Sequence, residues 1–237
     1  MKLKILGSSS SGNCYLLKNK EETLMIECGL PYKEILKGLD FNLHNVVGVL
    51  ASHLHFDHCK AVNDLIKLGV SIYANKETFD YLKVSEVLRH TIESEYQFKA
   101  GNFTVLPFSL QHDVPNLGFL IQCEGQKVLY ITDTYFCKYK FLGLTHILIE
   151  CNYSKEILQK NVENGLSITL VKRLIKSHFS LENVKQFLKT NDLSECKDIT
   201  LLHLSDANSN AEQFKNEIER LTGIPVYVAD KGLEIEL

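Results

Sequence analysis

The amino-acid sequence predicts an α/β protein in which two β-sheets pack together and helices cover the outside. Short apolar runs bounded by turn residues recur along the chain, as strands do in such folds. In each half, antiparallel strands come first, and strands alternating with helices follow. A chain of 237 residues with 45% hydrophobic content is long enough to bury one large core.

The composition excludes several classes of protein. No apolar run approaches the length of a membrane span, and the apolar part of residues 1–6 is too short for a signal peptide. The seven cysteines are scattered and never spaced as Cys-x-x-Cys, which predicts reduced thiols in a cytoplasmic protein. The net charge of −3 does not mark a nucleic-acid binder. A local basic face or bound divalent cations can still attract a polyanion.

The first half of the chain contains the strands that lead to the candidate site. We predict strands over residues 2–6, 14–18, 23–27, 46–50 and 71–74, and helices over residues 31–39, 59–68 and 76–84. The Ser/Gly-rich loop at residues 7–13 has two interpretations. It can present hydroxyl and N–H groups to a phosphate, or it can be a flexible turn between two strands.

The second half begins with two predicted hairpins, which pair residues 96–99 with 102–107 and residues 118–123 with 127–132. Further strands are predicted over residues 146–150, 199–204, 225–228 and 233–236. Helices are predicted over residues 167–176, 181–189 and 210–221. No low-complexity segment or linker interrupts these elements.

A cluster of metal-ligand side chains follows the strand at residues 46–50 directly. It reads Ser52-His53-Leu54-His55-Phe56-Asp57-His58. In an extended loop, His53 and His55 point to the same side, and Asp57 and His58 can face a second position. Imidazole and carboxylate ligands together suit zinc, manganese or iron. The alternative, a chance cluster of loop histidines, is disfavoured by this density of ligands after an apolar strand.

Other candidate ligands also stand at the ends of apolar strands. His112 can complete a three-histidine set with His53 and His55, and Asp133 can bridge two metals. His203 can complete the shell of the second metal. Taken alone, a histidine at the end of a strand usually has a structural role, and that alternative applies to each one separately.

Two metals bridged by Asp133 would lie roughly 3.5–4 Å apart and hold a water between them. Such a water has a pKa of roughly 7, so a bridging hydroxide is available as a nucleophile at neutral pH. It can attack an ester, an amide or a phosphodiester. Asp57 is the natural residue to orient it or to take its proton.

Glu150 and His178 bear on the leaving group. A carboxylate that is hydrogen-bonded to an imidazole raises its basicity and fixes its orientation. Such a pair can protonate a departing alkoxide, for which a β-lactamase has no obvious need. The alternative is that Glu150 caps a helix at residues 153–160 and that His178 is a loop residue.

The His-x-His-x-Asp-His loop resembles the signature loop of the metallo-β-lactamase superfamily. Further motifs are similar to one subgroup, the YycJ/WalJ-like metallohydrolases of bacteria and their phages, and they lie at residues 8–14, 111–113, 118–119, 132–134, 150–153, 178–183 and 203–208. The resemblance covers essentially the whole chain. It implies an αββα sandwich of the metallo-β-lactamase type and a single domain over residues 1–237. Two residues depart from the subgroup's pattern: Ser177 stands where the subgroup usually has a small residue, often Gly, and Cys151 stands where it commonly has a small residue.

The resemblance also implies roles for the candidate residues. The first metal would be bound by His53, His55, His112 and Asp133, and the second by Asp57, His58, His203 and Asp133. Glu150 and His178 would assist catalysis, as a comparable Glu and His do in phosphodiesterases such as tRNase Z. Members of the subgroup are associated with 5′-to-3′ exonuclease activity on DNA.

We therefore predict a dinuclear metal-dependent phosphodiesterase, a cytoplasmic DNA exonuclease that uses two divalent ions, zinc or manganese, with iron as a further option. One rival is a hydrolase of a small cyclic phosphodiester, thioester or lactone. A second is a non-enzymatic binding protein that keeps the fold. For DNA, Lys172, Arg173 and Lys176 can contact phosphates, or form an ordinary solvated helix face. The aromatic residues after Asp133 can stack on bases or pack as core; they are Tyr135, Phe136, Tyr139 and Phe141.

Overall fold

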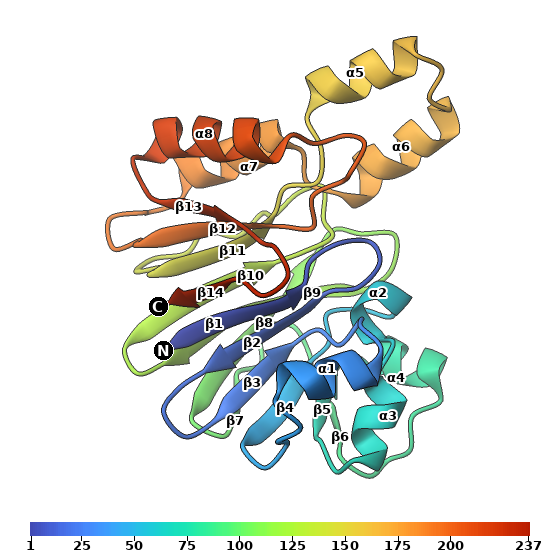
Figure 1. Cartoon of the computed structure of the whole chain (residues 1–237), viewed down its shortest axis with the longest axis vertical. Helices are drawn as coiled ribbons and strands as arrows, with labels where there is room; N and C mark the ends of the chain where they lie inside the picture. Colours follow the sequence, from blue (N-terminus) through green and yellow to red (C-terminus); the bar gives the residue numbers. More distant parts are fainter. The chain divides into compact units, whose positions relative to one another are not determined.

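The computed structural model describes all 237 residues, and its strands form two seven-stranded sheets accompanied by helices (Figure 1). The chain divides into two compact units. The first unit comprises residues 1–109, 114–126 and 229–237, and the second comprises residues 110–113 and 127–228. The prediction of a single domain over residues 1–237 stays a prediction.

The first sheet has the strand order β14-β1-β2-β3-β4-β5-β6. Its strands are β1 (Lys2–Gly7), β2 (Cys14–Lys18), β3 (Thr23–Ile26), β4 (Val46–Leu50), β5 (Ile72–Ala74), β6 (Arg89–Thr91) and β14 (Glu234–Glu236). Strands β1 to β3 are antiparallel, and β3 to β6 are parallel. Because Ile26 is in register with Leu50, the segments that follow β3 and β4 leave the sheet at the same edge.

The helices of the first unit are α1 (Tyr32–Gly38), α2 (Phe56–Cys59), α3 (Val62–Lys67) and α4 (Lys76–Leu82). Ile35, Val62, Leu65 and Phe79 are fully buried from these helices, in a core that also takes Val49 and Ile72 from the sheet. Burial of these apolar side chains is the main force that holds helices and sheet together.

The predicted helix over residues 59–68 is wrong at its start, because α2 ends at Cys59 and the next helix, α3, begins only at Val62. In a continuous helix the N–H of Ala61 would donate to the carbonyl of Asp57. Here that carbonyl accepts the N–H of Asn13 at 2.8 Å, and Ala61 donates to the carbonyl of Cys28 at 2.9 Å. The break therefore ties α2 to two distant segments of the first unit.

The second sheet has the order β13-β12-β11-β10-β9-β8-β7. Its strands are β7 (Phe98–Ala100), β8 (Phe103–Leu110), β9 (Asn116–Cys123), β10 (Gln126–Ile131), β11 (His146–Glu150), β12 (Asp198–Leu202) and β13 (Val226–Val228). Strands β10 to β13 are parallel, with Ile131 opposite Ile149 and Glu150 opposite Leu202. Their carboxyl ends therefore meet at one edge, where the predicted site residues follow.

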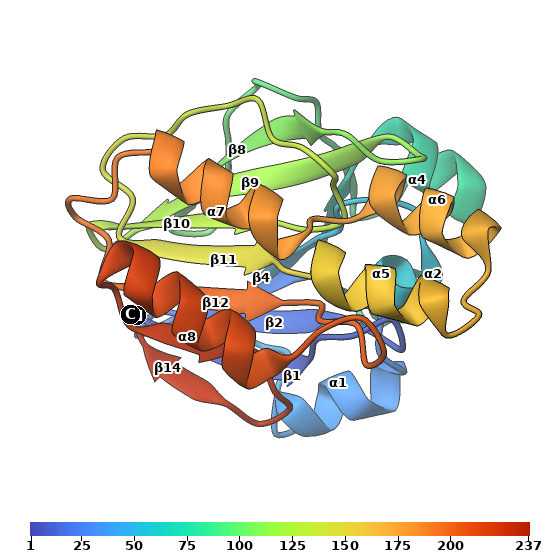
Figure 2. The same ribbon diagram turned by 90° about the horizontal axis from the view of Figure 1, so that it is seen from above.

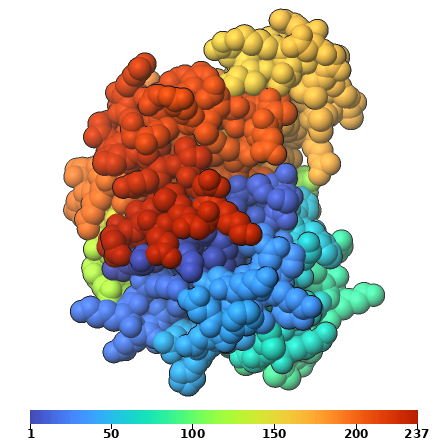
Figure 3. Space-filling view, viewed as in Figure 1, coloured from blue at the N-terminus to red at the C-terminus, as the bar shows by residue number.

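The helices of the second unit are α5 (Lys155–Glu163), α6 (Ile168–Ser177), α7 (Leu181–Thr190) and α8 (Ala211–Thr222). Helices α7 and α8 lie over β11 and β12 (Figure 2), and they bury Val184, Leu188, Phe214 and Ile218. Helices α5 and α6 form a lobe that projects beyond α7 and α8, coloured yellow and light orange in Figure 3. None of the helices combines the length and the apolar character that a bilayer crossing requires.

Candidate metal centre

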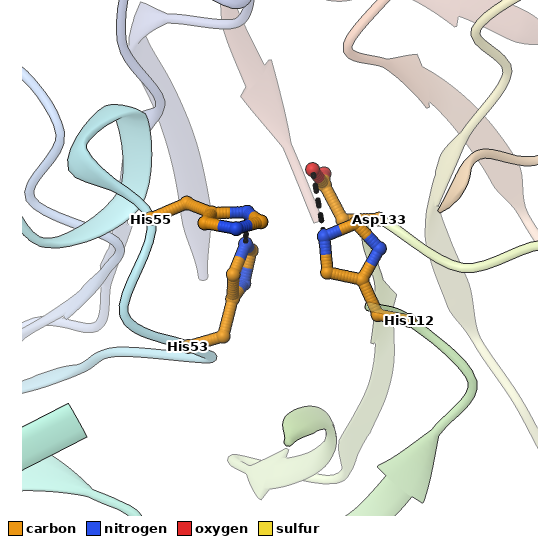
Figure 4. A group of neighbouring side chains, drawn as sticks. All are labelled: His53, His55, His112 and Asp133. Carbon is orange, nitrogen blue, oxygen red and sulfur yellow. Dashed lines mark hydrogen bonds and ion pairs between the residues drawn. The ribbon is translucent and has the colours of Figure 1, made fainter. Parts of the chain in front are cut away.

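The loop after β4 brings His53 and His55 together as predicted. His53 is fully buried, and its Nε2 atom lies 3.1 Å from Nδ1 of His55 (Figure 4). The backbone of His55 is extended, with φ −66° and ψ 143°, so the two imidazoles fall on one side of the loop. Ser52 Oγ lies 2.8 Å from Nδ1 of His53 and fixes the orientation of that ring.

Asp57 and His58 lie in helix α2 and not in an extended loop, so this detail of the prediction is wrong. The helix begins at Phe56, directly after His55. His58 is fully buried, and its Nε2 atom lies 3.3 Å from Asp57 Oδ2. The rings of His58 and His53 are 4.2 Å apart between centroids. The first unit therefore gathers all four side chains of the predicted motif.

Glu27 is a site residue that the sequence analysis missed. It is fully buried, with Oε1 3.3 Å from Nδ1 of His58, and its Oε2 accepts the N–H of Ser52 at 3.2 Å. A carboxylate behind an imidazole in this way orients metal-binding histidines. The signal was present, because Glu27 follows an apolar strand in the same way as Asp133 does.

Asn13 and Gly29 hold α2 against the end of the Ser/Gly loop. Asn13 is buried, and its Nδ2 atom lies 3.2 Å from Nε2 of His58 and donates to the carbonyl of Asp57 at 3.2 Å. A Cβ atom on residue 29 would lie 1.7 Å from that same carbonyl oxygen. Only glycine permits this close approach. The end of the loop at residues 7–13 is therefore a fixed support for His58.

In the second unit, Asp133 follows β10 and is buried, in a left-handed backbone conformation with φ 44°. Thr132 Oγ1 donates to Asp133 Oδ1 at 2.7 Å. The Nε2 atom of His112 lies 3.9 Å from Asp133 Oδ2 (Figure 4). His112 and Asp133, two of the predicted ligands, therefore lie next to each other within the second unit.

The tautomer of His112 is set by its other nitrogen. Nδ1 lies 2.9 Å from the carbonyl oxygen of Ser177, which can only accept, so Nδ1 carries the proton and Nε2 is left as the nitrogen that could bind a metal ion. Burial lowers the pKa of His112, although the carboxylates of Asp133 and Asp113 act in the opposite direction. The neutral imidazole is the form that binds metal ions.

Glu150 and His178 form a close pair, with 2.5 Å between Glu150 Oε1 and His178 Nδ1. The other oxygen of Glu150 accepts the N–H of Thr134 at 3.1 Å and the N–H of Phe179 at 3.0 Å. The alternative role for Glu150, a helix cap, is wrong because Ser154 caps α5.

The opposite charges of Glu150 and His178 stabilise each other. Burial opposes the ionisation of both groups. The attraction of His178 nevertheless lowers the pKa of Glu150, and that of Glu150 raises the pKa of His178. The pair therefore favours a carboxylate next to a protonated imidazole.

His203 joins the same cluster from the end of β12. Its Nδ1 atom lies 3.3 Å from Glu150 Oε1 and 3.6 Å from Asp133 Oδ1. Ligand atoms of Asp133, Glu150, His178 and His203 all lie within 4.8 Å of one another. Asn152, which the sequence analysis also missed, donates to the backbone carbonyl of His203 at 2.8 Å and holds that residue at φ 52°.

Both clusters have the chemistry of divalent-metal ligands. Each unit gathers buried imidazoles with carboxylates, which is the donor set of zinc sites. Burying several carboxylates together is costly unless cations compensate them. The residues present therefore fit bound divalent metal ions.

Residues 34–157, more than half of the chain, match the family model for the beta-lactamase superfamily domain. The chain therefore belongs to the metallo-β-lactamase superfamily. The exodeoxyribonuclease WalJ of Streptococcus pneumoniae is 27% identical over 229 residues, which cover 89% of this chain and 84% of that protein.

Solved structures agree with the fold. The metallo-β-lactamase fold protein YhfI from Bacillus subtilis has a TM-score of 0.75 at 16% identity and covers 99% of both chains. Zinc-bound PqqB from Methylobacterium extorquens has a TM-score of 0.75 at 15% identity and covers 100% of both chains. The predicted fold class, an α/β protein of the metallo-β-lactamase type, is confirmed.

Proposed function

We propose that the chain is a dinuclear metal-dependent phosphodiesterase that acts as a DNA exonuclease. The observation that carries this proposal is the Glu150–His178 pair, which lies beside the candidate ligands Asp133 and His203. Hydrolysis of a phosphodiester needs a proton donor for the departing oxygen. The pair supplies one within the same unit.

The proposed ligands are those of the sequence analysis. His53, His55, His112 and Asp133 bind one ion, and Asp57, His58, His203 and Asp133 bind the other. Bound zinc or manganese, with iron as a further option, would supply Lewis-acid charge and an acidified water at neutral pH. Asp57 keeps a side chain that is 22% exposed. It can therefore reach solvent and orient the attacking water or accept its proton.

His178 assists the leaving oxygen in this proposal. Its side chain is 22% exposed, whereas that of Glu150 is fully buried. Because Nδ1 is engaged by Glu150, Nε2 is the nitrogen that can donate a proton to the substrate. Glu150 holds the ring in place and stabilises its protonated form.

DNA is the proposed substrate class, because the relative from Streptococcus pneumoniae is named an exodeoxyribonuclease. Helix α6 carries Lys172, Arg173 and Lys176, all exposed. Its last residue, Ser177, directly precedes His178. Side chains of this kind bind phosphates without reading sequence. We place the activity in the cytoplasm, in keeping with the scattered cysteines.

The test is hydrolysis of 5′-labelled single- and double-stranded DNA by metal-free protein to which Mn²⁺ or Zn²⁺ is added back, alongside Asp57→Ala. We expect metal-dependent release of nucleotides from one end, and none from the variant, which should keep its fold because Asp57 is partly exposed. Absence of DNA cleavage together with turnover of a small chromogenic phosphodiester would move the substrate to the small-molecule class.

A further inference from the structure

The second unit contains a cavity of about 460 Å³ that the proposed metal chemistry does not use. It lies between the segment after Asp133 and helix α7. Its lining residues are mostly aromatic, basic or amide-bearing: Tyr135, Phe136, Cys137, Lys138, Tyr139, Lys140, Phe179, Asn183, Gln186, Phe187 and Thr190. A volume of this size is typical of small-molecule sites.

The aromatic lining has a buried part and an exposed part. Phe179 and Phe187 are 1% and 5% exposed, and their ring centroids lie 6.4 Å apart. Tyr135 and Phe136 are 39% and 54% exposed. Phe136 therefore leaves more than half of its surface in water, where a ligand at the cavity can cover it.

The basic and amide groups lie at the same cavity. Lys138 Nζ is 5.1 Å from the ring centroid of Tyr139, within the range of a cation–π contact. Lys140 is also exposed and lines the cavity. The Nδ2 atom of Asn183 donates to the carbonyl of Tyr135 at 2.9 Å and so fixes the aromatic segment on α7. A ligand here would meet flat apolar rings and positive charge together.

Short covalent and hydrogen-bonded links join this cavity to the candidate catalytic groups. Tyr135 follows Asp133 by two residues, and Phe136 donates its N–H to Oγ1 of Thr134 at 3.3 Å. Phe179 follows His178, and its own N–H is bonded to Glu150. The walls of the cavity are therefore positioned by the same segments that hold Asp133 and His178.

We propose that this cavity binds a nucleobase of the DNA strand next to the scissile phosphate, with Lys138 and Lys140 compensating a neighbouring phosphate. The inference rests on the proposed nuclease function and adds the subsite that holds the substrate. Aromatic rings stack on any base, so the site would accept all four bases. Stacking of one base changes binding by about tenfold in such sites.

The first experiment combines a change in the protein with a change in the substrate. Metal-loaded protein cleaves a 5′-phosphorylated oligodeoxynucleotide that carries an abasic residue at one of the first three positions. For the wild type, kcat/KM should fall by about tenfold when the abasic residue is at the position whose base fills the cavity. For Phe136→Ala, kcat/KM on the intact strand should already be about tenfold lower than for the wild type. An abasic residue at that position should then cause no further decrease.

The second experiment needs no hydrolysis. Binding of 5′-phosphorylated pentathymidylate with a 3′ fluorophore is followed by anisotropy in proteins that also carry Asp57→Ala. Phe136→Ala should weaken this binding by about tenfold. The matched control is Tyr81→Ala on α4, which removes an exposed aromatic ring (58%) that does not line the cavity and should bind as its parent does.

The two proposals can fail separately. DNA cleavage that is unchanged by Phe136→Ala, or a loss that is equal at all three positions, would overturn the base-binding site and leave the nuclease. Phe136-dependent binding of pentathymidylate without cleavage would keep the site and overturn the nuclease. If Phe136→Ala and Tyr81→Ala bind pentathymidylate equally well, the base-binding site is overturned, whether or not the protein cleaves DNA.

Discussion

Glu27 is a buried carboxylate that we expect to support the proposed metal site without binding an ion itself. Its carboxylate lies 3.3 Å from Nδ1 of His58 and also accepts the N–H of Ser52, next to His53. One buried group thus supports both ends of the histidine motif. The change to test is Glu27→Gln, which keeps the size of the side chain and removes its charge.

For Glu27→Gln we expect a metal affinity about 10–100-fold lower, the usual effect of removing such a supporting carboxylate. Competition with a chromogenic chelator measures it. Glu21→Gln, which changes an exposed carboxylate nearby in the sequence, is the control. A variant that melts earlier and binds metal as the wild type does would show that Glu27 stabilises only the fold.

His178→Ala separates catalysis from metal binding. The proposal assigns His178 to the leaving oxygen, so turnover of a phosphodiester should fall by about 10²–10⁴-fold, the usual contribution of a general acid. Metal content, measured by atomic emission, should stay the same. His44→Ala removes an exposed histidine and should change neither quantity. Loss of one metal ion from the His178 variant would make His178 a ligand instead.

At the scale of elements, the sequence predicted most of the framework. Strands β2, β4 and β11 have the predicted bounds, because each is a run of apolar residues with polar neighbours. Strand β6 (Arg89–Thr91) was missed, since its residues Arg89, His90 and Thr91 carry no apolar signal. It is held instead by pairing with β5. Local patterns cannot reveal a strand that exists only through its neighbour.

The sequence analysis found the candidate ligands that follow apolar strands. It missed the residues that support these ligands from distant segments of the chain. His112 and Asp133 carried their own signal at the ends of strands. Asn13, Glu27 and Asn152 act through contacts with residues 25 or more positions away, such as the contacts of Glu27 with Ser52 and of Asn152 with His203. The local pattern marks Glu27 only as a polar residue after an apolar strand, and it does not show which distant residue Glu27 supports.

Helix α6 is the element that should govern affinity for DNA. Replacing Lys172, Arg173 and Lys176 by Ala should weaken DNA binding and reduce the slope of log K against log salt by up to about three, one for each phosphate contact. Anisotropy titrations at several salt concentrations measure this slope. Turnover of a small chromogenic phosphodiester should not change.

The control for α6 is Lys33→Ala with Lys37→Ala, two exposed charges on α1. These changes lower the net charge without touching α6. The change in the slope of log K against log salt, divided by the number of charges removed, is compared for the α6 and α1 variants. If this value is the same for both, the general charge of the protein, and not helix α6, attracts DNA.

At the scale of the whole molecule, the proposed ligand sets combine residues of both compact units, because Asp133 is assigned to both ions. Metal binding should therefore couple the unfolding of the two units. With metal at about 100 times its Kd, each of the two ions adds about 2.7 kcal/mol, so we expect one calorimetric transition and a rise in Tm of about 10–20 °C over the metal-free protein. This result would also support the single domain over residues 1–237.

Asp133→Asn is the matched variant for this experiment. It keeps the size of the side chain but weakens its bond to both ions, so the metal-dependent rise in Tm should shrink for both units. Two transitions in the metal-loaded wild type, only one of which responds to metal, would contradict the proposed sharing of ligands.

Three residues of the candidate site adopt a backbone conformation that favours glycine. Glu27, Asp133 and His203 have φ values of 60°, 44° and 52°, each at a cost of about 1 kcal/mol or more for a residue with a Cβ atom. The chain therefore gives up stability at the three places where it needs a polar side chain. In the absence of metal ions, a laboratory selection for heat resistance alone should replace these residues by glycine or asparagine. A selection that also demands turnover should leave them unchanged and gain its stability elsewhere.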